Sequence, residues 1–218
     1  NWVMNSKIVV GIDFSECSLN ALAHAVSLAE KSNLEIVMVW VNKFSEENVL
    51  HHNNELILSG AKLHFSKLVE KYKPILGDRI SYVIKEGRVY ESINELCQEL
   101  NPLLVIIGTH GISGFSEKWL GSNAYRVALM LDTPVIIIRN VIDVEKSLTK
   151  ILLPIDSTVE TRQKLPLTAK LAQCFDATVY VLGVHTSTLD DIENKVKSYV
   201  NQVATYLEER NVKYEVDE

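Results

Sequence analysis

The chain has 218 residues, of which 47% are hydrophobic and 23% are charged, and its formal net charge is -6. This composition is enough for a hydrophobic core, and it argues against a disordered chain. The acidic balance argues against a nucleic-acid coat protein, which needs a basic surface. We find no run of 18 apolar residues and no signal-peptide pattern at the start, so we expect a cytoplasmic protein without a membrane span.

Short runs rich in Val and Ile alternate with longer segments of helical period from Lys7 to Arg139. Strands are predicted at 7–13, 34–41, 79–87, 103–109 and 134–139, and helices at 18–31, 46–73, 89–100 and from Ser122 onward. The strands at 103–109 and 134–139 are almost continuously apolar, which is typical of a parallel sheet covered on both faces. We therefore predict a doubly wound parallel α/β fold of five strands.

The second part of the chain repeats the beginning of the first. An ungapped alignment that places Lys7 on Lys150, called the repeat alignment below, matches "KIVVGID" with "KILLPID" and "VMVWV" with "YVLGV". Identical residues recur along it: Lys7, Ile8, Ile12, Asp13, Leu22, Leu28, Ala29 and Val41 match Lys150, Ile151, Ile155, Asp156, Leu165, Leu171, Ala172 and Val184. We predict one domain over 1–140 and a partial second α/β repeat over 150–218.

The second repeat is expected to be incomplete. It offers a strand, a helix, the strand "ATVYVLGV", a helix near 189–210 and "VKYEVDE", and it lacks a glycine-rich loop. Pro166 implies that its first helix starts late or is kinked. A sheet that ends in "VKYEVDE" has an uncovered edge, so we favour a native chain that continues past Glu218 over a half-domain that leans on another chain.

Four glycines lie between the fourth predicted strand and the following helix, in "GTHGISGFSEKWLGS". Gly108 and Gly111 have two residues between them, and Gly111 and Gly121 have nine. This loop falls at the carboxyl edge of a parallel sheet, where ligands usually bind. Glycine lets backbone amides approach an anion, and the start of a helix adds free N–H groups and a positive dipole end. The pattern favours a phosphate group, although a sharp connecting turn would use the same residues.

Taken together, these elements resemble the universal stress protein family. The spacing G-x2-G-x9-G-[ST] resembles the ATP-binding signature of that family, and "VVGIDFSE" and "TPVIIIR" occur in the family's order and separation. The resemblance covers residues 7–139 and, as an incomplete second copy, 150–218. It implies a five-stranded sheet of order 3-2-1-4-5 that pairs through its fifth strand, as a homodimer or an internal pseudo-dimer.

The resemblance also implies a nucleotide site. Asp13 would lie beside the adenosine of ATP, AMP or ADP and near a hydrated Mg²⁺, and the Val41 backbone would face the adenine edge. Gly108 would border the ribose. The phosphates would be held by Gly111, Gly121, Ser122 and the backbone amide of Asn123. The expected nucleotide-side residues also include Gly11, Ile12, His110 and Gly114. Gly11 stands where the family often has proline, as its repeat does at Pro154.

Plainer interpretations remain open for these residues. Asp13 would also serve to cap the turn before the first helix, and Ser122 is expected to be a helix N-cap. His110 would also suit a solvated loop, and Gly114 would also supply loop geometry alone. The pair His51 and His52 has no third metal-binding residue at a suitable spacing in the sequence. The cysteines Cys17, Cys97 and Cys174 also lack the spacing of a zinc site.

The predicted function is a nucleotide-dependent stress-response or signalling module. The alternative is a slow ATPase or nucleotidyl-transfer enzyme that uses the same crevice. The sequence has no Walker motif and no kinase set, and Lys118 is the only lysine of the glycine loop. Fast phosphoryl transfer needs charged groups around the phosphates and an oriented nucleophile, so binding without fast turnover is favoured and no catalytic residue is assigned.

Overall fold

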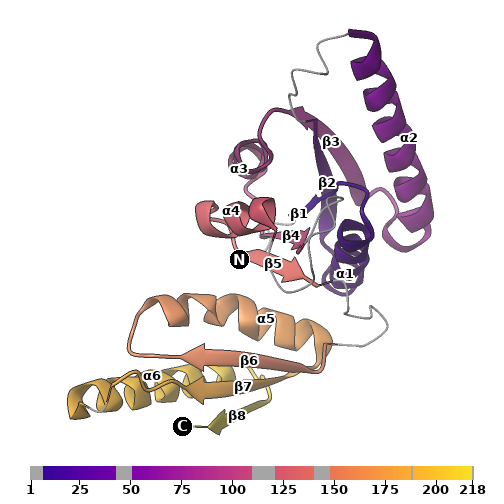
Figure 1. Ribbon diagram of the computed structural model, residues 1–218. Coiled ribbons are helices and arrows are strands. Elements are labelled where there is room, and N and C mark those ends of the chain that lie inside the picture. The colour runs from indigo at the N-terminus through magenta and orange to yellow at the C-terminus, as the bar shows by residue number, and fades with distance from the viewer. Residues whose placement is uncertain (1–6, 43–50, 110–120, 140–147, 188, 218) are drawn as a thin grey trace. The chain divides into compact units, whose positions relative to one another are not determined.

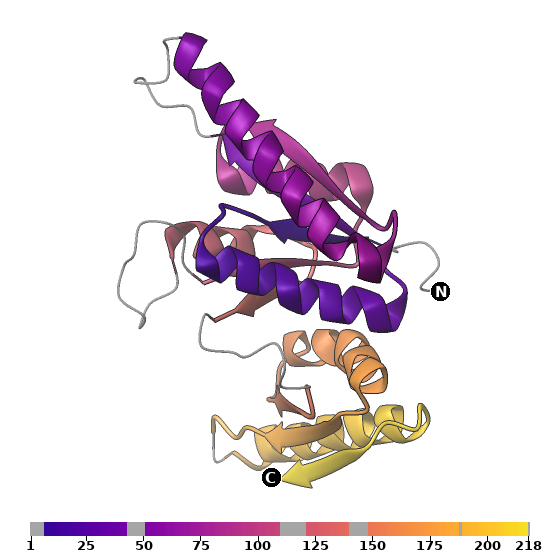
Figure 2. The ribbon, with the colours of Figure 1, turned by 90° about the vertical axis from the view of Figure 1, so that its right-hand side faces the viewer.

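The computed structural model describes residues 7–42, 51–109, 121–139, 148–187 and 189–217. The chain forms two compact units, Asn1–Val144 and Glu145–Glu218. Each unit has its own sheet and its own covering helices (Figures 1 and 2).

A five-stranded parallel sheet forms the centre of the first unit. Its strands are β1 (Lys7–Gly11), β2 (Glu35–Asn42), β3 (Ile80–Glu86), β4 (Leu104–Gly108) and β5 (Val135–Ile138). Their order in the sheet is β3-β2-β1-β4-β5, and all four pairings are parallel. The predicted fold class and strand order are confirmed. Because the order reverses between β1 and β4, the carboxyl ends of these two strands flank the position where ligands of such sheets bind.

Helices cover both faces of this sheet, as the apolar strands predicted. The helices are α1 (Glu16–Ser32), α2 (His51–Leu76), α3 (Val89–Leu100) and α4 (Ser122–Met130). Figure 1 shows α1 and α2 on one side of the sheet and α3 and α4 on the other. The α3–α4 face buries Val9, Val37 and Val39 against Ile93 and Val127. Because helices cover both faces of the sheet, neither face is left open to water, and the strands are therefore apolar at nearly every residue.

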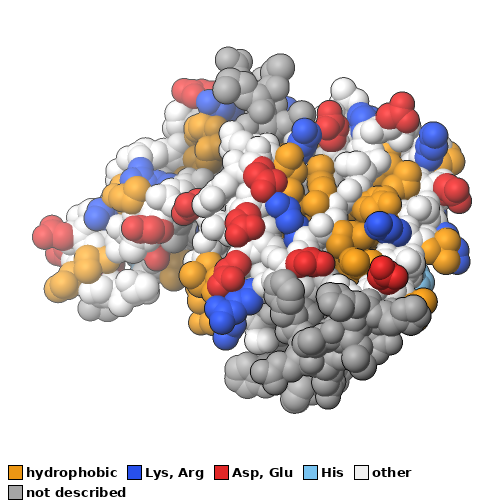
Figure 3. Space-filling view, turned by 90° about the horizontal axis from the view of Figure 1, so that it is seen from above, with side chains coloured by type: hydrophobic (Ala, Val, Ile, Leu, Met, Phe, Trp, Pro, Cys, Tyr) orange, Lys and Arg blue, Asp and Glu red, His pale blue; other side chains and the backbone are white. Residues whose placement is uncertain are grey.

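Apolar side chains also occur on the surface of the molecule. Leu56 and Leu63 of α2 are exposed. Figure 3 shows that hydrophobic side chains on the face it views are interspersed with lysines, arginines and acidic residues. Scattered exposed apolar residues are normal in globular proteins, so these positions require no special explanation.

The second unit contains a three-stranded parallel sheet of order β6-β7-β8. Its elements are β6 (Lys150–Ile155), the 3-10 helix η3 (Glu160–Lys164), α5 (Leu165–Phe175), β7 (Thr178–Gly183), α6 (Asp190–Glu208) and β8 (Tyr214–Asp217). Pro166 lies in the first turn of α5, where its missing N–H has no intrahelical acceptor to lose. The helix starts late, as predicted, and the preceding residues form η3 instead.

The repeat alignment relates strand pairing as well as sequence. In the first unit Lys7 is opposite Glu35 and Gly11 is opposite Val39. The aligned positions of the second unit are also paired, because Lys150 is opposite Thr178 and Pro154 is opposite Leu182. The helices that follow β1 and β6 end alike, at Asn33 and Asp176, which have φ angles of 54° and 52°.

A carboxylate turn after the first strand is repeated under the same alignment. Oδ1 of Asp13 accepts hydrogen bonds from the N–H and the hydroxyl of Ser15. In the second unit, Oδ1 of Asp156 accepts from the N–H and the hydroxyl of Thr158 and from the hydroxyl of Thr161. The Thr158 hydroxyl is the largest cause of a lowered pKa of Asp156, because each of these hydrogen bonds favours the charged carboxylate.

This lowered pKa predicts how pH affects the second unit. A carboxyl whose pKa is lower in the folded state stabilises the fold above its unfolded pKa, which is about 3.9 for aspartate. That contribution is lost as pH falls through the folded pKa. We expect the Asp156 carboxyl to titrate at a higher pH in Thr158→Val than in the unchanged chain, as measured by carboxyl NMR. An unchanged midpoint would show that the Thr158 hydroxyl does not set this pKa.

Candidate nucleotide site at the carboxyl edge of the first sheet

Asp13 follows β1 and stands at the carboxyl edge of the sheet, where the sequence placed it. Its Oδ1 closes the turn onto Ser15, whose hydroxyl in turn accepts from the N–H of Ser18 and caps α1. The Asp13 N–H donates to the Ser18 hydroxyl over 3.3 Å. The interpretation of Asp13 as a turn-forming residue is therefore correct. The turn occupies Oδ1 and does not involve Oδ2, so a second role for the carboxylate is compatible with it.

Phe14 fixes the direction of the chain beyond Asp13. Its φ of 62° lies in the left-handed region, which is unfavourable for a bulky residue. The Phe14 ring centroid lies 5.1 Å from those of His64 and Phe65 on α2. Packing against α2 thus holds a strained backbone in place directly after Asp13.

Gly11 and Ile12 line the end of β1 but serve the fold as well. The Ile12 N–H donates to the Val39 carbonyl over 2.8 Å, so this amide is already used within the sheet. A Cβ on Gly11 would lie 3.0 Å from Cγ2 of Ile107. A side chain at position 11 would therefore have to displace Ile107.

Val41 presents main-chain groups beyond the end of β1. In a parallel strand, the N–H and C=O of one residue point to the same side, and this side alternates along the strand. The Val39 carbonyl faces β1, so the polar groups of Val41 face the same side, past Gly11. The sequence predicted that β2 would end at Val41, but the strand runs one residue further. Its last residue is Asn42, whose carbonyl accepts from Gly87 on the β3 side.

The second unit closes the corresponding position. There, the N–H of Val184 donates to the Ile155 carbonyl over 2.8 Å. Among the described residues of the first unit, no matching bond joins Val41 to Ile12. Among the described residues, the N–H and C=O of Val41 thus have no partner, whereas in the second unit the corresponding N–H, that of Val184, is bonded within the sheet.

Gly108 ends β4 in close contact with α1. A Cβ on Gly108 would lie 2.8 Å from Sγ of Cys17 and 2.9 Å from the Cys17 carbonyl carbon and oxygen. Such distances are too short for a side chain, and two of the three atoms belong to the backbone. The absence of a Cβ at this position is therefore required by helix–strand packing, whatever else Gly108 contacts.

Thr109 joins the base of the glycine loop to the fold. Its N–H donates to the Ile138 carbonyl over 3.0 Å, and its carbonyl accepts from the Gly121 N–H over 2.8 Å. Its hydroxyl lies 3.6 Å from Sγ of Cys17. These contacts hold the two ends of the loop together. Sequence reasoning missed Thr109, and only its position directly after Gly108 could have drawn attention to it.

The start of α4 differs by one residue from the prediction. Gly121, not Ser122, is the N-cap, and no side chain of the described residues caps this helix. Ser122 is the first helical residue because the Gly121 N–H bonds to Thr109 and the Gly121 carbonyl accepts from Tyr125. The helical amides of Ser122, Asn123 and Ala124 belong to the turn that has no intrahelical acceptor. His110, Gly111 and Gly114 lie outside the described residues.

The residues that the structure describes contain no cluster of three or more metal-ligating side chains. Every helix in the described part of the chain is too short or too polar to cross a bilayer.

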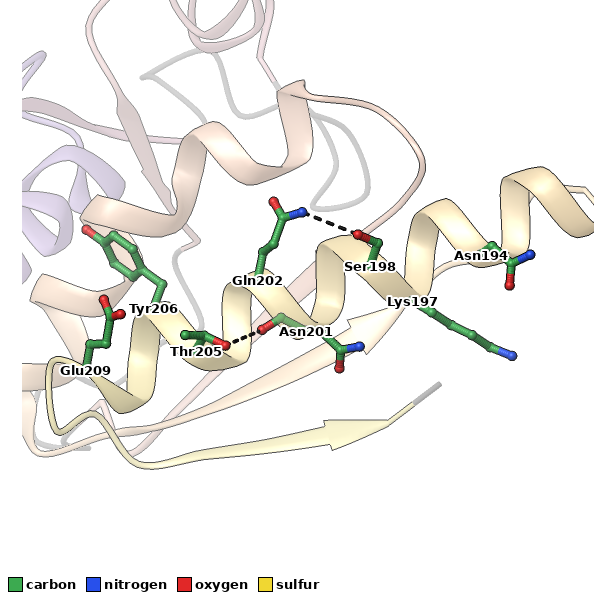
Figure 4. Close-up of a pocket in the computed structure, with 8 residues that line it drawn as sticks. All are labelled: Asn194, Lys197, Ser198, Asn201, Gln202, Thr205, Tyr206 and Glu209. Atoms are coloured by element: carbon green, nitrogen blue, oxygen red, sulfur yellow. Dashed lines mark hydrogen bonds between the residues drawn. The ribbon is translucent and has the colours of Figure 1, made fainter.

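A surface hollow of about 690 Å³ lies elsewhere, along α6 in the second unit (Figure 4). Its lining consists of Asn194, Lys197, Ser198, Asn201, Gln202, Thr205, Tyr206 and Glu209. All eight residues come from α6 and its C-terminal end, and two hydrogen bonds between them run along the helix, from Gln202 to Ser198 and from Thr205 to Asn201. Ligand pockets are concave and bury most of their ligand, whereas this hollow lies along one face of a single helix.

The first unit is thus a doubly wound α/β domain with one carboxylate, that of Asp13, at its strand-order reversal, where the described residues leave several main-chain groups without a partner among themselves. The model of the Universal stress protein family matches residues 4–139, which is more than half of the chain, and the chain belongs to that family. Universal stress protein YxiE of Bacillus subtilis is 27% identical over 148 residues, which cover 62% of this chain and all of that protein.

Two solved structures share the fold. A universal stress protein from Archaeoglobus fulgidus superposes with a TM-score of 0.75 over 97% of this chain and 77% of its own, at 14% identity. A universal stress protein in complex with cAMP superposes with a TM-score of 0.50 over 62% of this chain and 97% of its own, at 23% identity.

Proposed function

We propose that the chain binds an adenine nucleotide, ATP or a relative of it, at the carboxyl edge of β1 and β4 and acts as a nucleotide-dependent stress-response or signalling module. The observation that carries this proposal is the uncapped start of α4. A glycine occupies the N-cap of this helix, where Ser, Asn or Asp usually supplies an acceptor. The first amides of α4, which have no acceptor among the described residues, and the helix dipole favour an anionic group at this position.

The other groups of the site suit the remainder of such a ligand. The N–H and C=O of Val41 form an adjacent donor and acceptor, which is the pattern that the edge of an adenine ring needs. Asp13 lies at the end of the neighbouring strand, where its Oδ2 could face hydrated Mg²⁺. The complex of another family member with cAMP shows that the fold accommodates an adenine nucleotide in that protein, which supports the proposal.

The proposal is tested on the purified, full chain. In one experiment the protein is denatured with acid, and the released small molecules are separated on an anion-exchange column. In a second, isothermal calorimetry measures the affinity of the folded protein for ATP, cAMP and adenosine. We expect retained adenine nucleotide, or saturable ATP binding with one site per chain. If none of the three ligands binds, the proposal is wrong. A single-turnover assay distinguishes binding from the alternative of slow hydrolysis.

Asp13→Asn separates the charge of Asp13 from its role in the turn. Asparagine keeps a side-chain oxygen that accepts from Ser15, so the start of α1 should be preserved. We expect the affinity for ATP to fall about tenfold in Mg²⁺, equivalent to about 1.4 kcal/mol, and less in EDTA. Thermal unfolding should shift little. An unaltered dissociation constant in Mg²⁺ would remove Asp13 from the metal-nucleotide site.

We also propose that the first unit pairs through β5 with a second copy. β5 is an edge strand of the described sheet, and Leu129 and Met130 of the neighbouring α4 are exposed. The Ile138 and Pro134 carbonyls both face β4, so the main-chain groups of Ile137 point outward. Ile137→Pro removes an outward donor, and we expect it to convert a dimer to a monomer in light scattering. A dimer that survives would place the interface elsewhere.

A further inference from the structure

The last residue of β2 is an asparagine that the first unit buries. Asn42 is 8% exposed. Val37, Val39 and Val41 point to the α3–α4 face, so the Asn42 side chain points to the α2 face. There its Nδ2 donates to Oδ1 of Asn54 on α2 over 2.7 Å. A buried side-chain amide needs such a partner, because it loses its hydrogen bonds to water when the chain folds.

The main chain of Asn42 is held as well as its side chain. The Asn42 carbonyl accepts from the Gly87 N–H over 3.0 Å, and Asn42 lies opposite Glu86 of β3. The peptide group that joins Val41 to Asn42 is planar, so fixing Asn42 also fixes the direction of the Val41 carbonyl, which points to the other side, toward β1. The hydrogen bond to Asn54 therefore acts on the carbonyl that the proposed function assigns to the adenine edge.

The second unit differs at this position. Under the repeat alignment, β7 ends at the position of Trp40, whereas β2 continues through Val41 and Asn42. The counterpart of Asn42 is His185, and the residue before His185 donates its N–H to the Ile155 carbonyl. The main-chain groups without a partner among the described residues thus occur in the unit where an asparagine joins the end of the strand to the following helix.

We propose that Asn54 is a positioning residue that acts through Asn42 and determines the preference of the site for adenine over hypoxanthine. The exocyclic amine of adenine is a donor, so it pairs with the Val41 carbonyl. Hypoxanthine has a carbonyl at the same ring position, which would oppose the Val41 carbonyl and leave it unpaired. The phosphates would bind at the start of α4, so Asn54 should not affect them. The inference rests on the proposed function and names what sets its base specificity.

The test compares ATP with inosine triphosphate, which differs from ATP in its base, by calorimetry on the full chain. We expect the unchanged chain to bind ATP at least about tenfold more tightly, because a site that hydrogen-bonds the amine discriminates against a ligand without it. Asn54→Leu keeps a similar size and removes the acceptor of the Asn42 side chain. In this variant the affinity for ATP should fall about tenfold, the effect of one misaligned hydrogen bond, while the affinity for inosine triphosphate should not fall.

Asn54→Asp is the matched control. Aspartate keeps a side-chain oxygen that accepts from Nδ2 of Asn42, so the preference for ATP over inosine triphosphate should be retained. Thermal unfolding of both variants shows whether the domain stays folded.

Three results would overturn the inference. Equal losses of affinity for both nucleotides in Asn54→Leu would show that the contact between Asn42 and Asn54 supports the fold alone. An unchanged affinity for ATP in Asn54→Leu would show that this contact does not position the Val41 carbonyl. Equal binding of the two nucleotides by the unchanged chain would show that this carbonyl does not read the base. In the last two cases ATP still binds, so the proposed function stands, whereas it falls together with the inference if the unchanged chain binds neither nucleotide.

Discussion

Gly121→Val is expected to weaken ATP binding about 100-fold while leaving the domain folded. The Gly121 backbone has φ -59° and ψ 148°, a conformation that valine adopts readily, so no backbone reason requires glycine here. A valine side chain at the N-cap would occupy space in front of the amides of Ser122 and Asn123. Two lost charge-assisted hydrogen bonds at about 1.5 kcal/mol each correspond to an affinity loss of about 100-fold. Calorimetry with ATP measures the effect.

The nucleotide-free stability and the affinity for adenosine provide the controls. Adenosine has no phosphate, so its affinity should be unchanged in Gly121→Val. Gly121→Asp adds a side chain that caps the helix and a negative charge that repels phosphate, so thermal stability should hold or rise while ATP binding is lost. If ATP binds both variants as it binds the unchanged chain, the start of α4 is not the phosphate site.

The strands were predictable from local patterns, and their order was predictable from the family resemblance. Continuous apolar runs such as 103–109 identify buried parallel strands, and the family resemblance supplied the order. Parallel strands place their carboxyl ends at one edge, which brings Asp13 and Gly108 together although they lie far apart in the sequence. The periodic segments also predicted the two sheets, since the repeat alignment preserved the residues that face each core.

Features that depend on contacts between distant residues were not predictable. The contact of Gly108 with Cys17 and the bond from Gly121 to Thr109 join elements whose spacing no local pattern encodes. The N-cap prediction at Ser122 was wrong by one residue for this reason. Serine is the preferred cap by local propensity, but the tertiary bond to Thr109 fixes Gly121 outside the helix and places Ser122 inside it.

Gly108→Ala is expected to destabilise the first unit although the substitution adds one methyl group. The added Cβ would lie 2.8–2.9 Å from Sγ and from two backbone atoms of Cys17, so the end of β4 must move away from α1. Forcing a methyl group into a packed interior costs about 1–3 kcal/mol, and the same movement shifts Thr109 and therefore Gly121. Chemical denaturation should show the lower free energy of unfolding, and ATP affinity should fall with it.

The matched control is Gly60→Ala, because Gly60 lies within α2 and an added Cβ there meets nothing within 4 Å. That substitution should stabilise the protein by up to about 1 kcal/mol, because alanine is the better helix former. If Gly108→Ala proves as harmless as Gly60→Ala, the contact with Cys17 yields at little cost, and the glycine at position 108 must be explained by the ligand instead.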